Sequence, residues 1–403
     1  MTGVLRVARD VLFGVGAVSA TAEAVASLGR RVLICTDEFF VSRQEFQSVV
    51  ADLSAAGCAA AVFAAGRPDV PVATVLAAAQ AARAADCDVV VGFGGGSSID
   101  LAKAAALVAV HGEDVARFFG EGQVPGPVLP IVAVPTTAGT GSEVSPVAVV
   151  TQEAVKLKVG ISSPHLLPTF AIVDPALALS CPPTVTAHAG IDALAHAVES
   201  YVARSGRFTA AEALQRGFVG KNELTDPLAL HAVTLISRSL AAAYAAGDHL
   251  QARQDMALGS LYAGMAFSTA GTTLAHALQY PLGAKTGTPH GLGVGLLLPH
   301  VLRTMRPART AELSDIAVAM GIGAEPDAGP AAAEAAIDAI DALLDTVGFP
   351  SGLADLGLRA GDLPPIAAEA LGIRRLIDNN PLPVTEATLL DILRQALRGR
   401  SSR

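Results

Sequence analysis

Two patterns of apolar residues divide the chain. In the first half, short continuous apolar runs end in polar or glycine-rich turns, which is the pattern of buried parallel strands. The runs predicted as strands are residues 31–37, 59–63, 88–93, 128–134 and 170–175. Segments with helical spacing, several of them rich in alanine, lie between the runs, at residues 43–56, 72–85 and 99–110. We therefore expect a parallel α/β sheet covered by helices.

The pattern changes after Pro182 and Pro183. From there to Arg403 nearly every segment has helical periodicity, with glycine and proline breaks and few strand-like runs. A chain of 403 residues is long enough for two separate cores. The sequence thus predicts an α/β domain over residues 1–182 and an all-helical domain over residues 183–403.

Charge and composition narrow the functional classes. The formal net charge is −9 and there is no basic tract, so nucleic acid is not an expected partner. The uncharged run 122–141 is broken by proline and glycine, and no signal-peptide pattern begins the chain, so no membrane partner is expected. The four cysteines lack metal-type spacing and are typical of reduced thiols. We expect a cytoplasmic protein.

A glycine-rich turn follows the predicted strand 88–93 and precedes a helix. Glycines without side chains let backbone N–H groups approach a pyrophosphate, and the helix start adds positive potential. The predicted cofactor contacts in this turn are Gly94, Gly95, Gly96, Ser97 and Ser98. The spacing departs from G-x-G-x-x-G, because Ser97 occupies the third glycine position counted from Gly92. The alternative is a tight turn that needs glycine only for backbone reasons.

Two further groups fit a dinucleotide. Asp37 ends an early strand and can accept hydrogen bonds from the adenosine ribose, or it can serve only as a turn or cap residue. Its negative charge disfavours a 2′-phosphate, which favours NAD over NADP. Thr136, Thr137 and Thr140 supply hydroxyl groups beside the phosphates or the nicotinamide, although threonine and glycine are also ordinary loop residues.

A candidate metal site lies in the second half. Asp192 and His196 are four residues apart in the predicted helix 190–201, so both side chains leave the same face. Such a pair can bind one divalent ion, or it can be a hydrogen-bonded surface pair. His276 and His290 lie on an apolar background in a second stretch, and they would complete four ligands between helices. His188 lies one turn before Asp192 and, by spacing alone, is a rival ligand.

Four motifs in this order resemble the iron-containing (group III, metal-dependent) alcohol dehydrogenases. They are residues 94–103, 135–143, 190–201 and 289–300. The resemblance implies the dehydroquinate-synthase-like, iron-containing alcohol dehydrogenase fold, with an N-terminal α/β dinucleotide-binding domain, an all-α C-terminal domain and a catalytic cleft between them. Carried over by position, it implies Asp192, His196, His276 and His290 as metal ligands, Ser145 and Lys158 as cofactor contacts, and Asp37 at the ribose. It places no ligand at His188, which we interpret as a helix-start residue.

The resemblance also implies an activity. It is NAD(H)-linked hydride transfer between a small alcohol and its aldehyde or ketone, with Fe²⁺ or Zn²⁺ as the metal and a homodimer as the default assembly. Many members carry a second histidine one turn after the ligand equivalent to His276, where this chain has Tyr280. A tyrosine with a pKa near 10 is a poor base, although it can relay a proton. We therefore count Tyr280 among the candidate catalytic residues, and a ring packed beside Pro281 is the alternative.

Two other activities share this architecture. A tyrosine at this position also occurs in hydroxyacid–oxoacid transhydrogenases of the same superfamily, which hold their NAD tightly. A dehydroquinate-synthase-like lyase would need several basic residues around a phosphate-bearing substrate. Residues 264–300 offer only Lys285, so the lyase is the remote alternative.

Overall fold

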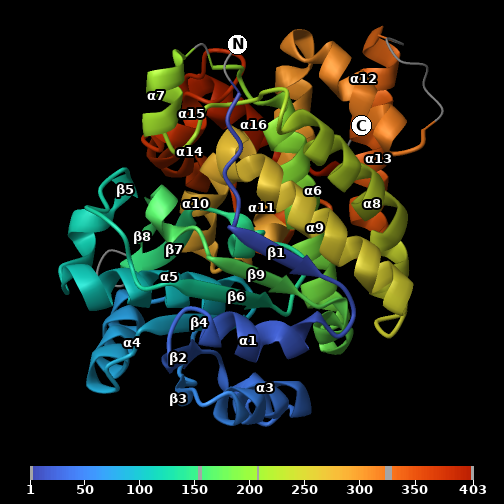
Figure 1. Cartoon of the computed structure of the whole chain (residues 1–403). Coiled ribbons are helices and arrows are strands. Elements are labelled where there is room, and N and C mark those ends of the chain that lie inside the picture. Colours follow the sequence, from blue (N-terminus) through green and yellow to red (C-terminus); the bar gives the residue numbers. More distant parts are fainter. Residues whose placement is uncertain (1–2, 153–156, 207, 323–328, 401–403) are drawn as a thin grey trace. The chain divides into compact units, whose positions relative to one another are not determined.

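The computed structural model describes residues 3–152, 157–206, 208–322 and 329–400. The chain divides into two compact units. One unit is Arg6–Cys181, and the other comprises the chain from Pro182 onward together with the segment that ends at Leu5. The first unit contains the strands, and the second is built from helices (Figure 1).

A six-stranded sheet organises the first unit. Its strand order is β1-β9-β6-β4-β2-β3, and each paired neighbour runs parallel. The strands are β1 (Asp10–Phe13), β2 (Arg31–Cys35), β3 (Ala59–Phe63), β4 (Val89–Gly94), β6 (Ile131–Pro135) and β9 (Phe170–Val173). The predicted parallel sheet is confirmed. The edge strand β1 was not predicted; its apolar run is only the three residues 11–13, and the strand alternates between exposed and half-buried positions.

Helices cover both faces of this sheet. Leu33 and Val90 pack towards α4 (Val72–Ala84) and α5 (Gly96–His111) in one apolar cluster. The alternating residues of the same strands pack towards α1 (Thr21–Ala26) and α3 (Gln44–Ala55) in another cluster, and the short helix α2 (Glu38–Val41) follows β2. Burial on both faces explains why the strands read as continuous apolar runs.

A second, smaller sheet was not predicted. It contains β5 (Gly120–Glu121), β7 (Val147–Gln152) and β8 (Leu157–Ser162), and β7 pairs with β8 antiparallel. Ala148 and Val150 of β7 join the apolar cluster around α5. Residues 147–150 of β7 form a short apolar run that the sequence analysis did not select, and only alternate residues of this strand are buried.

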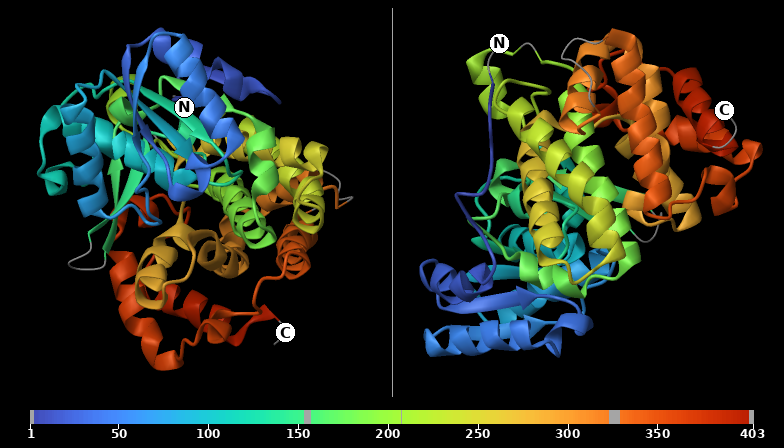
Figure 2. Two further views of the ribbon diagram at one scale, coloured as in Figure 1. Left: turned by 90° about the horizontal axis from the view of Figure 1, so that it is seen from below. Right: turned by 90° about the vertical axis from the view of Figure 1, so that its right-hand side faces the viewer.

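The second unit is helical, as predicted. Its longest helices, α6, α8 and α9, pack against one another and lie side by side in Figure 2. The helices are α6 (Pro183–Val202), α7 (Ala210–Gln215), α8 (Asp226–Ala245), α9 (Leu250–Ala270), α10 (Leu274–Thr286), α11 (His290–Met305), α12 (Thr310–Ala319), α13 (Gly329–Thr346), α14 (Leu363–Leu371), α15 (Arg374–Ile377) and α16 (Glu386–Arg398). By length and composition α8 could cross a bilayer, but its packing against α6 and α9 is that of a core helix.

Helix α6 begins earlier than predicted. Its first residue is Pro183, a favoured residue at a helix start, so Gly190 lies inside the helix and His188 is not at its start. A Cβ atom at Gly190 would overlap the side chain of Leu240 and lie 2.8 Å from Met256 Cε. The glycine therefore permits the close approach of α8 and α9 to α6.

Candidate functional site

Three predicted metal ligands meet in the helical unit. The ligand atoms of Asp192, His276 and His290 lie within 4.8 Å of one another. Asp192 Oδ1 is 3.6 Å from His276 Nε2 and 3.7 Å from His290 Nε2, separations too long for hydrogen bonds. The side chains of Asp192 and His276 are buried, whereas that of His290 is 33% exposed. The cluster is therefore enclosed on most sides and open at His290.

The helices place these side chains for reasons visible in the sequence. His276 lies in the first turn of α10, and His290 is the first residue of α11, directly after Pro289. A Cβ atom at Gly291 would overlap the carbonyl oxygen of His188 on α6. Because glycine has no Cβ, the start of α11 can approach the α6 backbone closely, which brings His290 beside Asp192.

His196 lies next to this cluster. It shares a face of α6 with Asp192, and its ring stacks on His276 with the ring centroids 4.7 Å apart. Its ring also stacks on Phe267, with a centroid distance of 4.3 Å. His196 is not among the residues whose ligand atoms lie within 4.8 Å of one another. Its function as a fourth ligand stays a prediction.

The electrostatics of the cluster favour a cation. Burial alone would raise the pKa of Asp192, but the surrounding imidazoles of His196, His290 and His276 outweigh it and lower that pKa. Burial would lower the pKa of His276, but the carboxylates of Glu199 and Asp192 outweigh it and raise the pKa to about 9. Burial would also raise the pKa of Glu199, but its contacts with His276, Thr273 and Ala275 outweigh it and lower that pKa, so both carboxyl groups hold their negative charge next to the imidazoles.

Two polar atoms of the cluster have no hydrogen-bond partner among the described residues. They are Asp192 Oδ1 and His276 Nε2, and both are buried. Buried polar atoms are almost always satisfied, because desolvation without a partner is costly. A carboxylate oxygen and imidazole nitrogens that point at one another are a donor set that suits Fe²⁺ or Zn²⁺. The residues present therefore fit a divalent metal ion.

Glu199 belongs to the same site, and the sequence analysis did not select it. It lies seven residues after Asp192 on the same face of α6, and its side chain is fully buried. It accepts hydrogen bonds from the Thr273 hydroxyl at 2.6 Å and the Ala275 amide at 2.8 Å, and it contacts His276 Nδ1. Spacings of four and seven residues from Asp192 on an apolar helix were the available signal.

Two other candidates lie near the ligands. Tyr280 is one turn after His276, and its ring centroid is 6.1 Å from that of His290. A catalytic function for Tyr280 stays a prediction. His188 instead packs edge-on against Phe349 with centroids 5.5 Å apart, and burial lowers its pKa.

The glycine turn of the first unit adopts the expected strand–turn–helix geometry. Strand β4 ends at Gly94 and α5 begins at Gly96, three residues earlier than predicted. Gly94 has a φ of 148°, which favours glycine, and a Cβ there would overlap Ser98 Oγ. A Cβ at Gly96 would lie 2.5 Å from the Thr140 methyl carbon.

The threonine loop lies against this turn. The ideal Cβ position of Gly95 is 3.5 Å from the Thr137 side chain, and the Thr136 amide donates to the Gly94 carbonyl at 2.9 Å. Thr136 Oγ1 is buried and has no hydrogen-bond partner among the described residues. The structure therefore brings together the glycine, serine and threonine residues predicted to contact the cofactor.

The three remaining predicted cofactor residues already have partners. Asp37 Oδ1 accepts from the amides of Phe39 and Phe40 at 3.0 and 3.3 Å, so this residue caps α2 as the alternative interpretation expected. Ser145 Oγ lies 3.4 Å from Lys103 Nζ. Lys158 donates to Asp69 at 2.5 Å. Cofactor contacts of Asp37, Ser145 and Lys158 stay predictions.

Ionisable residues connect α5 to the segment after the threonine loop: Lys103 and Glu143 are buried and Asp100 is half-buried. Lys103 donates to the carbonyl oxygens of Ser145 and Val147, each at 2.8 Å. Burial lowers the pKa of Lys103 to about 8, although Asp100 and Glu143 oppose this shift. Burial also raises the pKa of Glu143 to about 7. The sequence analysis did not select these residues.

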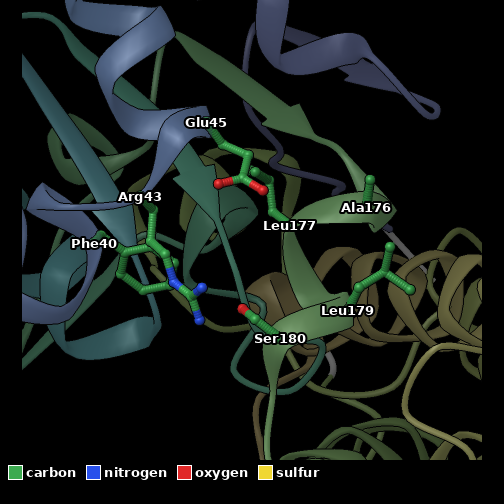
Figure 3. A pocket seen from close by; sticks show the side chains of 7 residues that line it. All are labelled: Phe40, Arg43, Glu45, Ala176, Leu177, Leu179 and Ser180. Atoms are coloured by element: carbon green, nitrogen blue, oxygen red, sulfur yellow. The ribbon is translucent and has the colours of Figure 1, made fainter.

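Figure 3 shows a pocket in the first unit. The residues that line it are Phe40, Arg43, Glu45, Ala176, Leu177, Leu179 and Ser180. Phe40 packs edge-on against Phe93, the residue before Gly94, with centroids 5.7 Å apart. The lining segments follow β2 and β9, so the pocket lies at the carboxyl edge of the sheet, where open α/β sheets bind ligands.

Comparisons with known proteins match nearly the whole chain. The family model of iron-containing alcohol dehydrogenases matches residues 8–175, and the C-terminal model of the Fe-containing alcohol dehydrogenase family matches residues 186–397. Long-chain-alcohol dehydrogenase 1 of Geobacillus thermodenitrificans is 37% identical over 390 residues, covering 96% of this chain and 94% of the relative. NAD-dependent methanol dehydrogenase of Bacillus methanolicus is 34% identical over 387 residues, with coverages of 96% and 97%. The crystal structure of a 1,3-propanediol oxidoreductase has a TM-score of 0.90 and 36% identity, and the match covers 98% of this chain and 100% of that one.

Proposed function

The chain belongs to the iron-containing alcohol dehydrogenase family, and from this premise we propose that it interconverts a small alcohol and its aldehyde or ketone with NAD(H). In the oxidative direction the alcohol loses a hydride to NAD⁺ and a proton to solvent, giving the carbonyl compound and NADH. The residues that would hold the divalent metal ion are Asp192, His196, His276 and His290. The observation that carries this proposal is the buried, unsatisfied pair of atoms Asp192 Oδ1 and His276 Nε2.

The bound ion supplies a Lewis acid that polarises the substrate oxygen, and NAD supplies the hydride acceptor. The residues of the chain control how water, substrate and protons reach the site. Phe267 and Leu274 are buried apolar residues near the ligands, and they exclude water from the closed side of the site. The substrate enters at the side where His290 is partly exposed, and the Tyr280 hydroxyl relays the proton that leaves the alcohol.

The α/β unit holds the cofactor. The turn from Gly94 to Ser98 binds the pyrophosphate at the start of α5, and the hydroxyl groups of Thr136, Thr137 and Thr140 lie beside it. Asp37 accepts from the ribose with the oxygen that does not cap α2, and Ser145 and Lys158 complete the contacts. The negative charge of Asp37 selects NAD, the cofactor that is also specified in the name of the Bacillus methanolicus relative.

The relatives indicate the reacting group of the substrate but not its chain length. The relatives named above act on long-chain alcohols, methanol and 1,3-propanediol, so the reacting group is common and the chain length is not. We expect a primary alcohol. A cytoplasmic location and a homodimer complete the proposal, and light scattering of the purified protein measures the assembly.

One experiment tests the activity and its metal dependence. Alcohols of one to eight carbons are assayed with NAD⁺, and the aldehydes with NADH, on chelator-treated enzyme and on enzyme reloaded with Fe²⁺ or Zn²⁺. We expect turnover only after reloading. Full turnover in the chelated protein would overturn the metal-dependent assignment.

The same assay addresses the transhydrogenase, which Tyr280 favours as the second candidate. That enzyme would reduce an oxoacid at the expense of a hydroxyacid and respond little to added free NADH. Turnover with free NADH and an aldehyde therefore supports the dehydrogenase.

A further inference from the structure

Glu199 is a fully buried acid that the proposed ligand set does not include. Its carboxylate reaches α10 across a gap of 77 residues in the sequence and contacts His276 Nδ1. A charged group without any solvent exposure is costly unless it is paired and hydrogen-bonded. The contacts of Glu199 therefore show which groups its negative charge interacts with.

Both carboxylate oxygens of Glu199 contact hydrogen-bonding groups at the start of α10. Oε1 accepts from the Thr273 hydroxyl at 2.6 Å and from the Ala275 amide at 2.8 Å. These two donors lie at the start of α10, where backbone amides have no partner within the helix. They hold the carboxylate in one orientation, with Oε2 directed at the His276 ring.

The contact with Oε2 determines the tautomer of His276. An ionised carboxylate has only acceptor atoms, so the ring nitrogen Nδ1 must carry the hydrogen. In a neutral imidazole the other nitrogen, Nε2, then has a free lone pair. Nε2 is the atom that lies 3.6 Å from Asp192 Oδ1 and that has no hydrogen-bond partner among the described residues.

We propose that Glu199 is a positioning residue that fixes the Nδ1-protonated tautomer of His276 and so keeps Nε2 available as a metal ligand. The inference rests on the proposed metal site. Glu199 also anchors the start of α10, so one side chain sets both the position and the tautomer of the ligand. Carboxylates that accept from a ligand histidine raise the basicity of that histidine and its affinity for the metal.

Glu199→Gln is the direct test. The glutamine oxygen is expected to stay with the Thr273 hydroxyl and the Ala275 amide, because both donate. Its amide then faces His276 Nδ1 as a donor, which moves the ring hydrogen to Nε2 and blocks the ligand atom. We expect the apparent Zn²⁺ dissociation constant, measured by competition with a chelating dye, to rise about 10- to 100-fold.

The unaltered protein provides a second readout. Long-range ¹H–¹⁵N correlation spectra of the ¹⁵N-histidine-labelled zinc enzyme report which ring nitrogen carries hydrogen, and His276→Ala identifies the signal. We expect hydrogen on Nδ1 of His276. Hydrogen on Nε2 overturns the proposal without reference to any variant at Glu199.

Tyr201→Phe is the matched control. Tyr201 lies two residues further along α6, and its hydroxyl donates to Asp315 at 2.6 Å, so the variant also loses one hydrogen bond of this helix. We expect its Zn²⁺ affinity to stay within about twofold of the starting protein, because the lost bond does not involve a ligand. An equal loss of Zn²⁺ affinity in both variants would assign the effect to the stability of α6 and overturn the proposal.

His276→Ala distinguishes a failure of the proposed function of Glu199 from a failure of the proposed metal site. If this variant loses Zn²⁺ affinity and Glu199→Gln does not, the positioning function of Glu199 is wrong and the metal site stands. If neither variant loses Zn²⁺ affinity, the proposed metal site itself is wrong.

Discussion

The buried carboxyl group of Glu143 should make the stability of the α/β unit depend on pH. Glu143 is 3% exposed, and burial raises its pKa from 4.5 to about 7. Because the folded pKa lies above the unfolded one, the favourable contribution is complete below about pH 4.5 and is lost as the pH rises through 7. At about 1.4 kcal/mol per pH unit, the ionised carboxylate lowers the free energy of unfolding by about 3 kcal/mol.

Glu143→Gln keeps the shape of the side chain and removes its ionisation. The variant loses the attraction between Glu143 and Lys103, but Asp100 remains as the stronger partner of that ammonium group. We compare the free energy of unfolding of the variant with that of the parent protein. Integration of the linkage relation from pH 5 to pH 7.5 predicts that this difference, variant minus parent, is about 2 kcal/mol larger at pH 7.5 than at pH 5. Both pH values lie below the pKa of about 8 of Lys103, so its ammonium group stays mostly protonated at both.

The assay must report on the α/β unit alone. All four tyrosines lie after residue 182 and there is no tryptophan, so intrinsic fluorescence reports on the helical unit. Urea titrations followed by hydrogen-exchange mass spectrometry of peptides from β4 and α5 measure the correct unit. Glu23→Gln, at an exposed position of α1, is the control. A variant-to-parent difference that is equal at the two pH values would refute the reasoning.

Three further substitutions test the site. Asp37→Asn keeps a good cap for α2 and removes the negative charge. The preference for NAD⁺ over NADP⁺ in kcat/KM should therefore fall about tenfold, a change of ~1.4 kcal/mol. An unchanged ratio would show that Asp37 does not contact the ribose of the cofactor. Gly96→Ala introduces a Cβ 2.5 Å from the Thr140 methyl carbon, and the crowding, about 1–3 kcal/mol, should weaken NAD⁺ binding about five- to 150-fold in calorimetric titrations. Tyr280→Phe should lower kcat about 100-fold at unchanged metal content if the hydroxyl relays the proton, whereas an unaltered kcat would identify Tyr280 as a packing residue.

Local features of the sequence were sufficient to predict most of the main sheet and the helical second half. Apolar runs bounded by turns predicted five of the six strands of the main sheet, because strands buried on both faces need apolar side chains at every position. The helical spacing of Asp192 and His196 predicted one buried face of α6, because side chains four residues apart project together from any helix. The glycine turn was recognisable because a strand, adjacent glycines and a helix follow one another directly in the chain.

Contacts between residues far apart in the sequence were decided only by tertiary packing. Gly190 looked like a helix boundary, but the side chains of α8 and α9 that make glycine necessary there belong to later segments. Glu199 could not be assigned to His276 from spacing, since only the folding of α6 against α10 brings the carboxylate to the ring nitrogen. The close approach of Gly291 to the α6 backbone likewise exists only in the folded unit. Periodicity determines which face of a helix is buried, and the contacts between distant helices determine what that face meets.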